Sequence, residues 1–197
     1  MAADERFYPK ELDMDFSPFM RHYERYMQCA KLIERIGKHE TWLDCACGSG
    51  YGTHFLSNFC EKVIGYDISN AAIEYATQTY SSDRTSFTSN LDELSNTKFN
   101  SIISIETIEH MEEGDAPKFL KSLRDMLEDN GDLIITTPIV PNTNRNPKNK
   151  FHFIEYSNKD FQALLSNSGF TVKKIALFET TFTDNETKDQ GYYLCSK

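Results

Sequence analysis

Two carboxylates and two imidazoles are spaced so that they could bind one divalent cation. Glu106, Glu109 and His110 follow an apolar run at residues 99–105, and His152 lies in a later loop. Residues at positions i, i+3 and i+4 share one face of a helical turn, so the first three side chains can converge. This mixed oxygen and nitrogen set suits Mg²⁺ or Mn²⁺ where ligands must exchange, and Zn²⁺ or Co²⁺ by affinity. A cation there could lower the pKa of an acceptor hydroxyl and position its oxygen for attack.

Other interpretations of the same residues remain open. His110 or His152 could act as a general acid or base without a metal. Glu106 could face a cofactor through its backbone, and Glu109 could be a solvated helix residue. The sequence therefore predicts catalytic roles for His110, His152 and Glu106, and leaves open whether a metal assists them.

A glycine-rich turn between two apolar runs predicts a nucleotide-type cofactor site. The first run ends at Asp44 and leads to Gly48 and Gly50, and the second run ends at Asp67. Glycines let the backbone approach a ligand closely. Asp67 lies 17 residues after Gly50, close to the spacing of roughly 20 at which a carboxylate reaches a ribose hydroxyl pair. A dinucleotide fingerprint would need a third glycine where Thr53 stands, which disfavours a nicotinamide cofactor.

This turn resembles motif I of the class I S-adenosylmethionine-dependent methyltransferases, with Ala46 in place of the family's first glycine. The resemblance implies that Asp44 lies near the cationic amino-acid end of S-adenosylmethionine. Asn90 stands where the family has a carboxylate, so the contact to the adenine amino group would come from its amide or from Asp92. The cofactor-binding positions that the resemblance implies are Asp44, Ala46, Gly48, Gly50, Asp67, Ile68, Asn90, Leu91 and Ile105.

The E-x-x-E-H pattern at residues 106–110, with a later histidine, also resembles a known set. It looks like the metal-binding set of the small-RNA 2′-O-methyltransferases, and a similar pattern occurs in ubiquinone-pathway O-methyltransferases. The resemblance implies that Glu106, Glu109, His110 and His152 are metal ligands. Further segments resemble bacterial methyltransferases associated with surface-polysaccharide or glycan synthesis. They are Glu5-Arg6-Phe7, residues 22–26, Asn146-Pro147, Phe151-His152 and Glu155-Tyr156-Ser157.

These resemblances imply S-adenosylmethionine-dependent O-methylation of a small hydroxylated molecule, such as a sugar or a catechol-like ring, assisted by Mg²⁺ or Mn²⁺. Two alternatives stay open. One is methylation of the ribose at an RNA 3′ end, and the other is a non-catalytic binding protein that keeps the fold.

The order of apolar runs predicts how these residues are brought together. Strands are expected at 41–45, 62–66, 85–89, 99–105, 131–137, 170–178 and 191–196, and helices at 51–59, 69–79, 115–128 and 157–168. This alternation predicts an α/β fold with a Rossmann-like, doubly wound sheet of seven strands. No helix separates the last two strands, which predicts a C-terminal hairpin that adds an antiparallel strand to a mostly parallel sheet.

A further helix is expected ahead of the first strand. Ser17-Pro18 is a favourable helix start and Gly37 a favourable stop, with apolar residues at spacings of three and four between them. We expect residues 1–37 to form an N-terminal helical cap over the cofactor cleft, whose aromatic side chains pack or touch a substrate. Residues 1–197 are expected to form one domain.

Net charge, cysteine spacing and the length of apolar runs limit the classes of partner that the protein is expected to bind. The net charge of −9 argues against a broad nucleic-acid surface, although residues 144–150 offer a local basic patch or a solvated loop. The five cysteines match no zinc spacing, and a reducing cytoplasm is the simplest setting. No apolar run approaches the ~18 residues of a membrane span, and the N-terminus carries no export signal. The expected partner is a small molecule.

Overall fold

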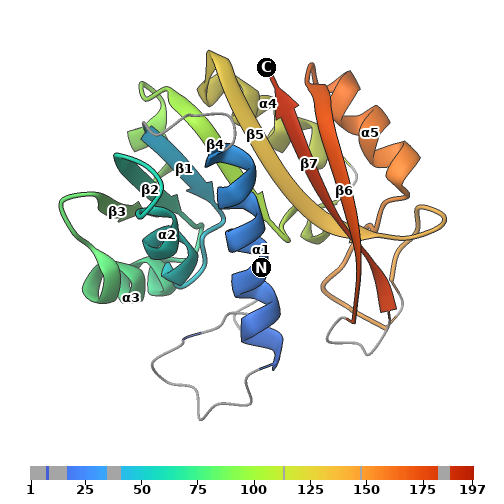
Figure 1. Ribbon diagram of the computed structural model, residues 1–197, viewed down its shortest axis with the longest axis horizontal. Helices are drawn as coiled ribbons and strands as arrows, with labels where there is room; N and C mark the ends of the chain where they lie inside the picture. The colour runs from blue at the N-terminus through green and yellow to red at the C-terminus, as the bar shows by residue number, and fades with distance from the viewer. Residues whose placement is uncertain (1–7, 9–16, 35–40, 113, 147, 182–186) are drawn as a thin grey trace.

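A seven-stranded mixed sheet forms the centre of the protein (Figure 1). The structure is a computed structural model that describes residues 8, 17–34, 41–112, 114–146, 148–181 and 187–197. In chain order the strands are β1 (Thr41–Cys45), β2 (Lys62–Tyr66), β3 (Thr85–Thr88), β4 (Phe99–Ile105), β5 (Leu127–Ile139), β6 (Thr171–Thr181) and β7 (Thr187–Ser196). Strand β7 is antiparallel to β5 and β6, and the other neighbouring pairs are parallel. The predicted sheet with its antiparallel C-terminal hairpin is confirmed.

Helices cover both faces of this sheet. They are α1 (Ser17–Glu34), α2 (Tyr51–Leu56), α3 (Asn70–Tyr80), α4 (Ala116–Met126) and α5 (Asn158–Asn167), with the 3₁₀ turns η2 (Leu91–Leu94) and η3 (Ile108–His110). Trp42 packs in a core with residues of α1 and α2, whereas Leu43 packs in a second core with α4 and α5. Because successive strand residues point to opposite faces, a strand buried on both faces reads as a continuous apolar run.

The strand order reverses beside β1, in the sequence β3-β2-β1-β4-β5-β7-β6. Doubly wound sheets bind ligands in the crevice outside the carboxyl ends of the strands at such a point. Ala46 and Glu106 directly follow β1 and β4, and they are the non-glycine residues with positive φ within the described ranges, at 70° and 49°. Backbone strain of this kind concentrates at functional sites. We therefore infer that the functional site lies at the edge of the sheet where β1 and β4 end.

Several predicted element boundaries differ from those in the structure: α2 ends at Leu56 rather than at 59, β6 runs to Thr181 rather than to 178, and β7 begins at Thr187 rather than at 191. The error between α4 and β5 has an identifiable cause. The sequence predicts a helix at 115–128 that stops at Asn130-Gly131, but α4 ends at Met126 and β5 begins at Leu127. Gly131 lies inside β5, close to where the pairing with β4 changes register. A Cβ there would lie 2.9 Å from the carbonyl oxygen of Glu128. This glycine therefore permits a close backbone approach within the sheet rather than ending a helix.

Helix α5 is capped at both ends. At its start, Ser157 Oγ accepts the N–H of Asp160 at 3.1 Å. At its end, Gly169 takes a φ of 87° and its N–H donates to the Ser166 carbonyl at 3.0 Å. The cap at Ser157 fixes the end of the loop that leads from β5 to α5 and carries His152.

The N-terminal helix lies over the centre of the sheet, where Figure 1 shows α1 in front of β4. It contacts α2 and β4. The predicted stop at Gly37, and the rest of the predicted cap outside Ser17–Glu34 except residue 8, lie outside the described residues. None of the described helices combines the length and apolar character needed to cross a membrane.

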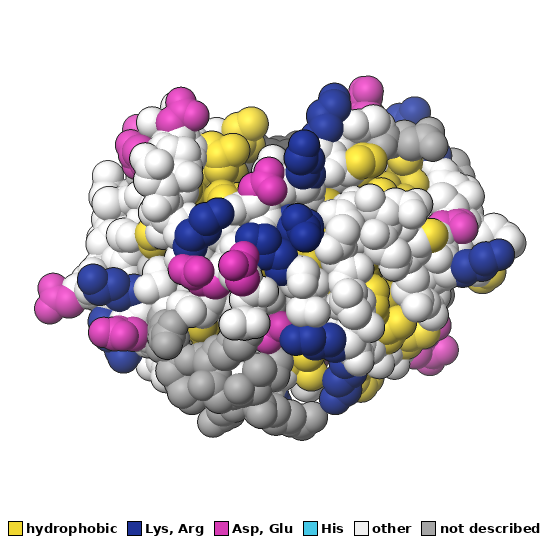
Figure 2. Space-filling view, turned by 90° about the horizontal axis from the view of Figure 1, so that it is seen from above, with side chains coloured by type: hydrophobic (Ala, Val, Ile, Leu, Met, Phe, Trp, Pro, Cys, Tyr) yellow, Lys and Arg dark blue, Asp and Glu magenta, His cyan; other side chains and the backbone are white. Residues whose placement is uncertain are grey.

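Charges of both signs are mixed on the face of the molecule that Figure 2 presents. Lys and Arg side chains there lie among Asp and Glu side chains and do not form a continuous basic surface. This distribution agrees with the net charge of −9.

Candidate active site

The turn between β1 and α2 is held in a left-handed conformation. Ala46, Gly48 and Gly50 have φ values of 70°, 56° and 84°. The N–H groups of Ala46 and Cys47 both donate to the carbonyl of Tyr66, at 2.7 and 2.9 Å. The turn is thereby fixed to the end of β2, at the edge of the sheet where β1 and β2 end.

Gly50 is also required for space, because a Cβ there would lie 2.6 Å from Ala76 Cβ and 2.7 Å from the Phe87 ring. Gly48 meets no such contact, so its positive φ is what favours glycine.

Ala46, which stands where the resembling family has its first glycine, adopts a strained left-handed backbone conformation. Left-handed φ costs an L-residue roughly 1–2 kcal/mol, and glycine avoids that cost. We predict that Ala46→Gly raises the free energy of unfolding by up to about 1 kcal/mol, after allowance for glycine's greater freedom in the unfolded chain. Urea denaturation measures this change. The control is Ala72→Gly in helix α3, which should lower stability by about 1 kcal/mol; equal losses in both variants would contradict the prediction.

Asp44 lies fully buried at the end of β1. Thr53 Oγ1 donates to its carboxylate at 2.6 Å, and the Tyr26 hydroxyl lies 3.3 Å from both carboxylate oxygens. Burial raises the pKa of Asp44 to about 7, although these hydrogen bonds oppose the shift. A positive charge nearby would therefore stabilise the ionised form of Asp44, the carboxylate predicted to face the cofactor.

Asp67 joins the glycine turn to the next strand end. Its carboxylate accepts the N–H of Gly48 at 3.0 Å and the N–H of Ser69 at 2.9 Å. Beyond it, Ile68 is 79% exposed and Leu91 is 41% exposed. The chain thus places two exposed apolar side chains just after β2 and β3, which lie on one side of the reversal in strand order.

The remaining predicted cofactor positions differ in exposure. Asn90 is exposed, and its side chain accepts the N–H of Asp92 at 3.1 Å. Ile105 is buried in the core with α1, so its side chain serves packing.

Helix α1 contributes residues to this site that spacing arguments do not identify. A Cβ at Gly52, two residues after Gly50, would lie 2.0 Å from Cζ of Tyr26, so this glycine makes room for the ring. The hydroxyl of Tyr51 hydrogen bonds to Nδ1 of His22, one turn earlier on α1. The glycine turn and α1 therefore pack as one unit around Asp44.

Glu106 is held by residues from three elements, α1, β5 and β7. Its carboxylate accepts from Thr136 at 2.9 Å and from Gln190 at 2.6 Å, and it lies 3.6 Å from the Arg25 guanidinium. Arg25 Nε in turn donates to Gln190 at 2.9 Å. The helical turn expected over residues 106–110 begins only at Ile108, because Glu106 takes a positive φ.

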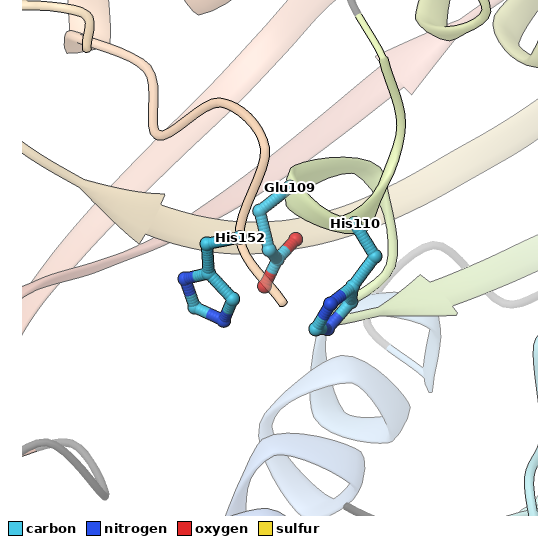
Figure 3. A group of neighbouring side chains, drawn as sticks. All are labelled: Glu109, His110 and His152. Carbon is cyan, nitrogen blue, oxygen red and sulfur yellow. The ribbon is translucent and has the colours of Figure 1, made fainter. Parts of the chain in front are cut away.

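Three of the four predicted metal ligands converge. Figure 3 shows the side chains of Glu109 and His110, from η3, and His152, from the β5–α5 loop, pointing toward one another. One ligand atom from each lies within 4.8 Å of the others. Glu106 is not part of this group. The expected convergence holds for three residues and fails for Glu106.

The hydrogen bonds of the histidines define their tautomers. Nδ1 of His110 lies 3.0 Å from the carbonyl of Phe151, and Nδ1 of His152 lies 2.6 Å from the Glu155 carboxylate. Both acceptors require an Nδ1–H, which places each lone pair on Nε2. Burial and the nearby His152 lower the pKa of His110 to about 4, so its imidazole is neutral at pH 7.

Glu109 is fully buried between these rings and the sheet. Thr137 Oγ1 donates to one of its carboxylate oxygens at 3.2 Å, and the other, Oε1, has no hydrogen-bond partner within the described ranges. Burial, together with the charge of Glu106, raises the pKa of Glu109 well above its usual value. A buried carboxylate with an unsatisfied oxygen beside two imidazoles has the character of an incomplete ligand set.

A family model described as a methyltransferase domain matches residues 20–175. The chain belongs to this family. Over 161 residues this methyltransferase domain is 27% identical to a probable S-adenosylmethionine-dependent methyltransferase of Mycolicibacterium smegmatis. That match covers 79% of the chain and 60% of the relative, so the chain spans about three fifths of the relative's length.

Solved structures share the fold of the methyltransferase domain. N-methyltransferase NodS from Bradyrhizobium japonicum, in complex with S-adenosyl-L-homocysteine, superposes with a TM-score of 0.72 at 20% identity, covering 93% of this chain and 89% of that one. Magnesium protoporphyrin IX methyltransferase from Synechocystis, with bound S-adenosylmethionine, gives a TM-score of 0.66 at 17% identity, covering 88% and 79%. These likenesses support the predicted fold.

A carboxylate that sequence reasoning did not single out orients His152 in this methyltransferase domain. Glu155 accepts from His152, from Asn146 at 2.9 Å and from Lys188 at 2.9 and 3.0 Å. Burial opposes ionisation of Glu155, but these hydrogen bonds outweigh it and lower its pKa. The segments 146–147, 151–152 and 155–157, noted above only for their resemblance, were the signal for this contact.

Proposed function

We propose that this chain is an S-adenosylmethionine-dependent methyltransferase. The left-handed turn after β1 and the Asp67 carboxylate beside it support the proposal, because both suit a nucleoside cofactor. Ile68 and Leu91 offer exposed apolar side chains that suit the faces of an adenine ring. We propose further that residues 1–197 act as one domain in a reducing cytoplasm, in line with five buried, free cysteines.

Calorimetric titration with S-adenosylmethionine tests the cofactor. Saturable binding to a single site is expected. Absence of binding by the folded wild-type chain would contradict the proposal, and binding without transfer to any acceptor would favour the non-catalytic alternative.

We propose that the acceptor is a small hydroxylated molecule and that Glu109, His110 and His152 bind Mg²⁺ or Mn²⁺ to activate it. The convergence of these three side chains is the observation that carries the proposal. The residues fit a cation, because Glu109 Oε1 is buried without a partner and both Nδ1–H groups are held by oxygen acceptors. When bound, the cation would lower the pKa of the acceptor hydroxyl.

Neighbouring residues of the chain would hold the side chains of His152, His110 and Glu106 in place. Glu155 orients His152, the Phe151 carbonyl orients His110, and the network of Arg25 and Gln190 holds Glu106 at the end of β4. Asp44 would lie near the cationic end of the cofactor. The burial of Glu109 and His152 keeps water from much of the ligand set.

Mn²⁺ titration followed by electron paramagnetic resonance tests the metal. We expect the wild-type chain to bind Mn²⁺ and Glu109→Gln to bind it at least ten-fold more weakly. Methyl transfer that is insensitive to a chelator would contradict the metal and leave His110 or His152 as a general base.

The Lys188–Glu155 ion pair yields a separate prediction. Lys188→Met leaves a buried carboxylate without its cationic partner, which typically costs about 3–5 kcal/mol of unfolding free energy. Because Glu155 also orients His152, Mn²⁺ affinity should fall ten-fold or more. Denaturation and Mn²⁺ titration measure the two effects.

Lys173→Met is the control for this variant, with a lysine side chain that is 45% exposed against 8% for Lys188. Lys173 pairs with the fully buried Asp132 at 2.9 Å, toward the other end of β5. It should lower stability and leave Mn²⁺ affinity unchanged. A parallel loss of Mn²⁺ affinity in both variants would show that destabilisation alone explains the effect.

RNA is the second candidate acceptor. The loop that carries His152 also carries Arg145, which lies 5.5 Å from the centre of the Phe153 ring, and Lys150, which lies 4.8 Å from that of Phe151. Basic and aromatic side chains of this kind suit a single-stranded nucleic acid. Transfer of a labelled methyl group to the 3′-terminal ribose of short RNAs tests this candidate. Its absence, beside transfer to small hydroxylated molecules, would exclude it.

A further inference from the structure

A cavity of about 940 Å³ opens beside the candidate active site. Its walls come from the loop after β5, the first turn of α5, the end of β6 and the start of β7. Residues from these walls include Asn142, Thr143, Asn158, Leu177, Glu179 and Lys188. The volume lies at the upper end of the range of roughly 300–1,000 Å³ that small-molecule sites occupy. The cavity can hold more than a single ring.

The cavity shares a sheet edge with two features described above. One is the glycine turn at residues 46–50, here called the cofactor turn, and the other is the group of Glu109, His110 and His152, here called the Glu109 cluster. β7 is antiparallel to both β5 and β6, so the carboxyl ends of β5 and β6 meet the start of β7 at the edge where β1 and β4 end. In strand order, the cofactor turn comes first, the Glu109 cluster lies at β4 and β5, and the cavity lies over β5, β7 and β6. A methyl donor in the cofactor turn and an acceptor in the cavity would thus lie on opposite sides of the Glu109 cluster.

Lys188 links the cavity to the cluster. It lines the cavity and contacts Glu155 at 2.9 Å, and Glu155 contacts His152 at 2.6 Å. The cavity is therefore separated from a proposed metal ligand by two hydrogen-bonded side chains.

The lining suits hydroxyl groups rather than an aromatic ring. No aromatic side chain occurs among the described residues that line the cavity. They include amides at Asn142 and Asn158 and carboxylates at Glu179 and Asp189. Hydroxyl groups donate to carboxylates and exchange both kinds of hydrogen bond with amides, whereas a catechol-like ring buries its faces best against apolar walls. The apolar lining residues are Ile139, Val140, Pro141 and Leu177. Ile139 and Val140 are buried, so Pro141 and Leu177, the latter 40% exposed, supply the apolar contacts for the face of a sugar ring.

We propose that this cavity binds the hydroxyl-rich, glycosyl part of the acceptor, and that the acceptor is larger than a monosaccharide. The inference rests on the proposed function and narrows its acceptor from two chemical classes to one.

Saturation-transfer NMR on the full chain tests the proposal. The probes are methyl β-maltoside and a panel of other methyl disaccharides, with catechol as the aromatic comparison. We expect at least one disaccharide to receive saturation and catechol to receive none. Leu177→Trp narrows the cavity, and we expect it to weaken disaccharide binding at least ten-fold. Asn142→Trp narrows the cavity from another wall and should have the same effect.

Phe178→Trp is the matched control. Phe178 neighbours Leu177 in β6, is 51% exposed and packs edge-on against Tyr192, outside the cavity lining. It should leave disaccharide binding unchanged, and all three variants should keep the wild-type affinity for S-adenosylmethionine. Binding of catechol alone, binding of no disaccharide, or disaccharide binding that survives both cavity variants would overturn the proposal. Loss of S-adenosylmethionine binding by the wild type would instead defeat the proposed function, since the two titrations are independent.

Discussion

The Gly52→Ala variant is expected to lose about 3 kcal/mol of unfolding free energy, in the upper range for an overpacked core. The added Cβ would lie 2.0 Å from the Tyr26 ring, which is itself buried and lies against Asp44. The ring must leave its place, and α1 must shift with it. Affinity for S-adenosylmethionine should fall as well, because Asp44 loses the hydroxyl that helps to hold it. Urea denaturation and calorimetric titration measure the two losses.

Gly48→Ala is the matched control in the same turn. A Cβ at Gly48 meets no atom within 4 Å, so only the positive φ opposes it, at roughly 1–2 kcal/mol. A double-mutant cycle with Tyr26→Ala then isolates the contact. The methyl group of Gly52→Ala should be tolerated once the ring is gone, with a coupling energy of about 2 kcal/mol. Equal losses in the two glycine variants, or a coupling near zero, would show that Tyr26 does not pack on Gly52 as described.

The Asp44→Asn variant is expected to stabilise the fold above pH 7 and to weaken cofactor binding. The pKa of Asp44 is about 7 in the folded chain against an ordinary value of 3.8, so the folded state binds the proton more tightly than the unfolded state. Stability therefore falls as pH rises from about 4 to 7 and stays low above that range. The loss is on the order of 4 kcal/mol, and an amide at this position removes it.

The difference between the wild-type and Asp44→Asn stability curves isolates this group from other titrating residues. Thermal or urea unfolding at several values between pH 4 and pH 8 gives the two curves. Cofactor affinity should fall about ten-fold or more at pH 8, since a hydrogen bond to a charged group contributes about 1.5–3 kcal/mol. Parallel curves, with no convergence toward pH 4, would mean that burial of Asp44 does not cost stability.

Much of the fold could be predicted from the sequence, because local signals there agree with tertiary packing. Strands such as β1 and β4 are buried on both faces, so their apolar runs mark their ends closely. Ser157 and Gly169 cap α5 through bonds between near neighbours, which spacing reveals. The boundary at Gly131 was wrong because a close approach in a sheet and a helix stop both call for glycine.

The site could be predicted only where its residues are close in sequence or follow strand ends. Glu109 and His110 are adjacent, and His152 follows β5, so their convergence was foreseeable. Glu106 departs from the group because a backbone turn to positive φ separates it from η3, and spacing carries no such information. Arg25 with Gln190 and Glu155 with Lys188 are contacts between distant segments, for which one sequence gives no local pattern.

The contacts of β7 determine which part of the candidate active site can form last during synthesis of the chain. Gln190 holds Glu106 and Arg25, and Lys188 holds Glu155, so both supports of the reactive edge come from the last strand. A ribosome that adds about 5–20 residues per second completes α1 and the glycine turn well before it reaches this strand. A nascent chain could therefore form the cofactor turn while its acceptor side is still unassembled. Under the proposed function, a chain in which β7 has not yet paired with β5 would lack both supports of Glu106 and Glu155 and would not consume the methyl donor.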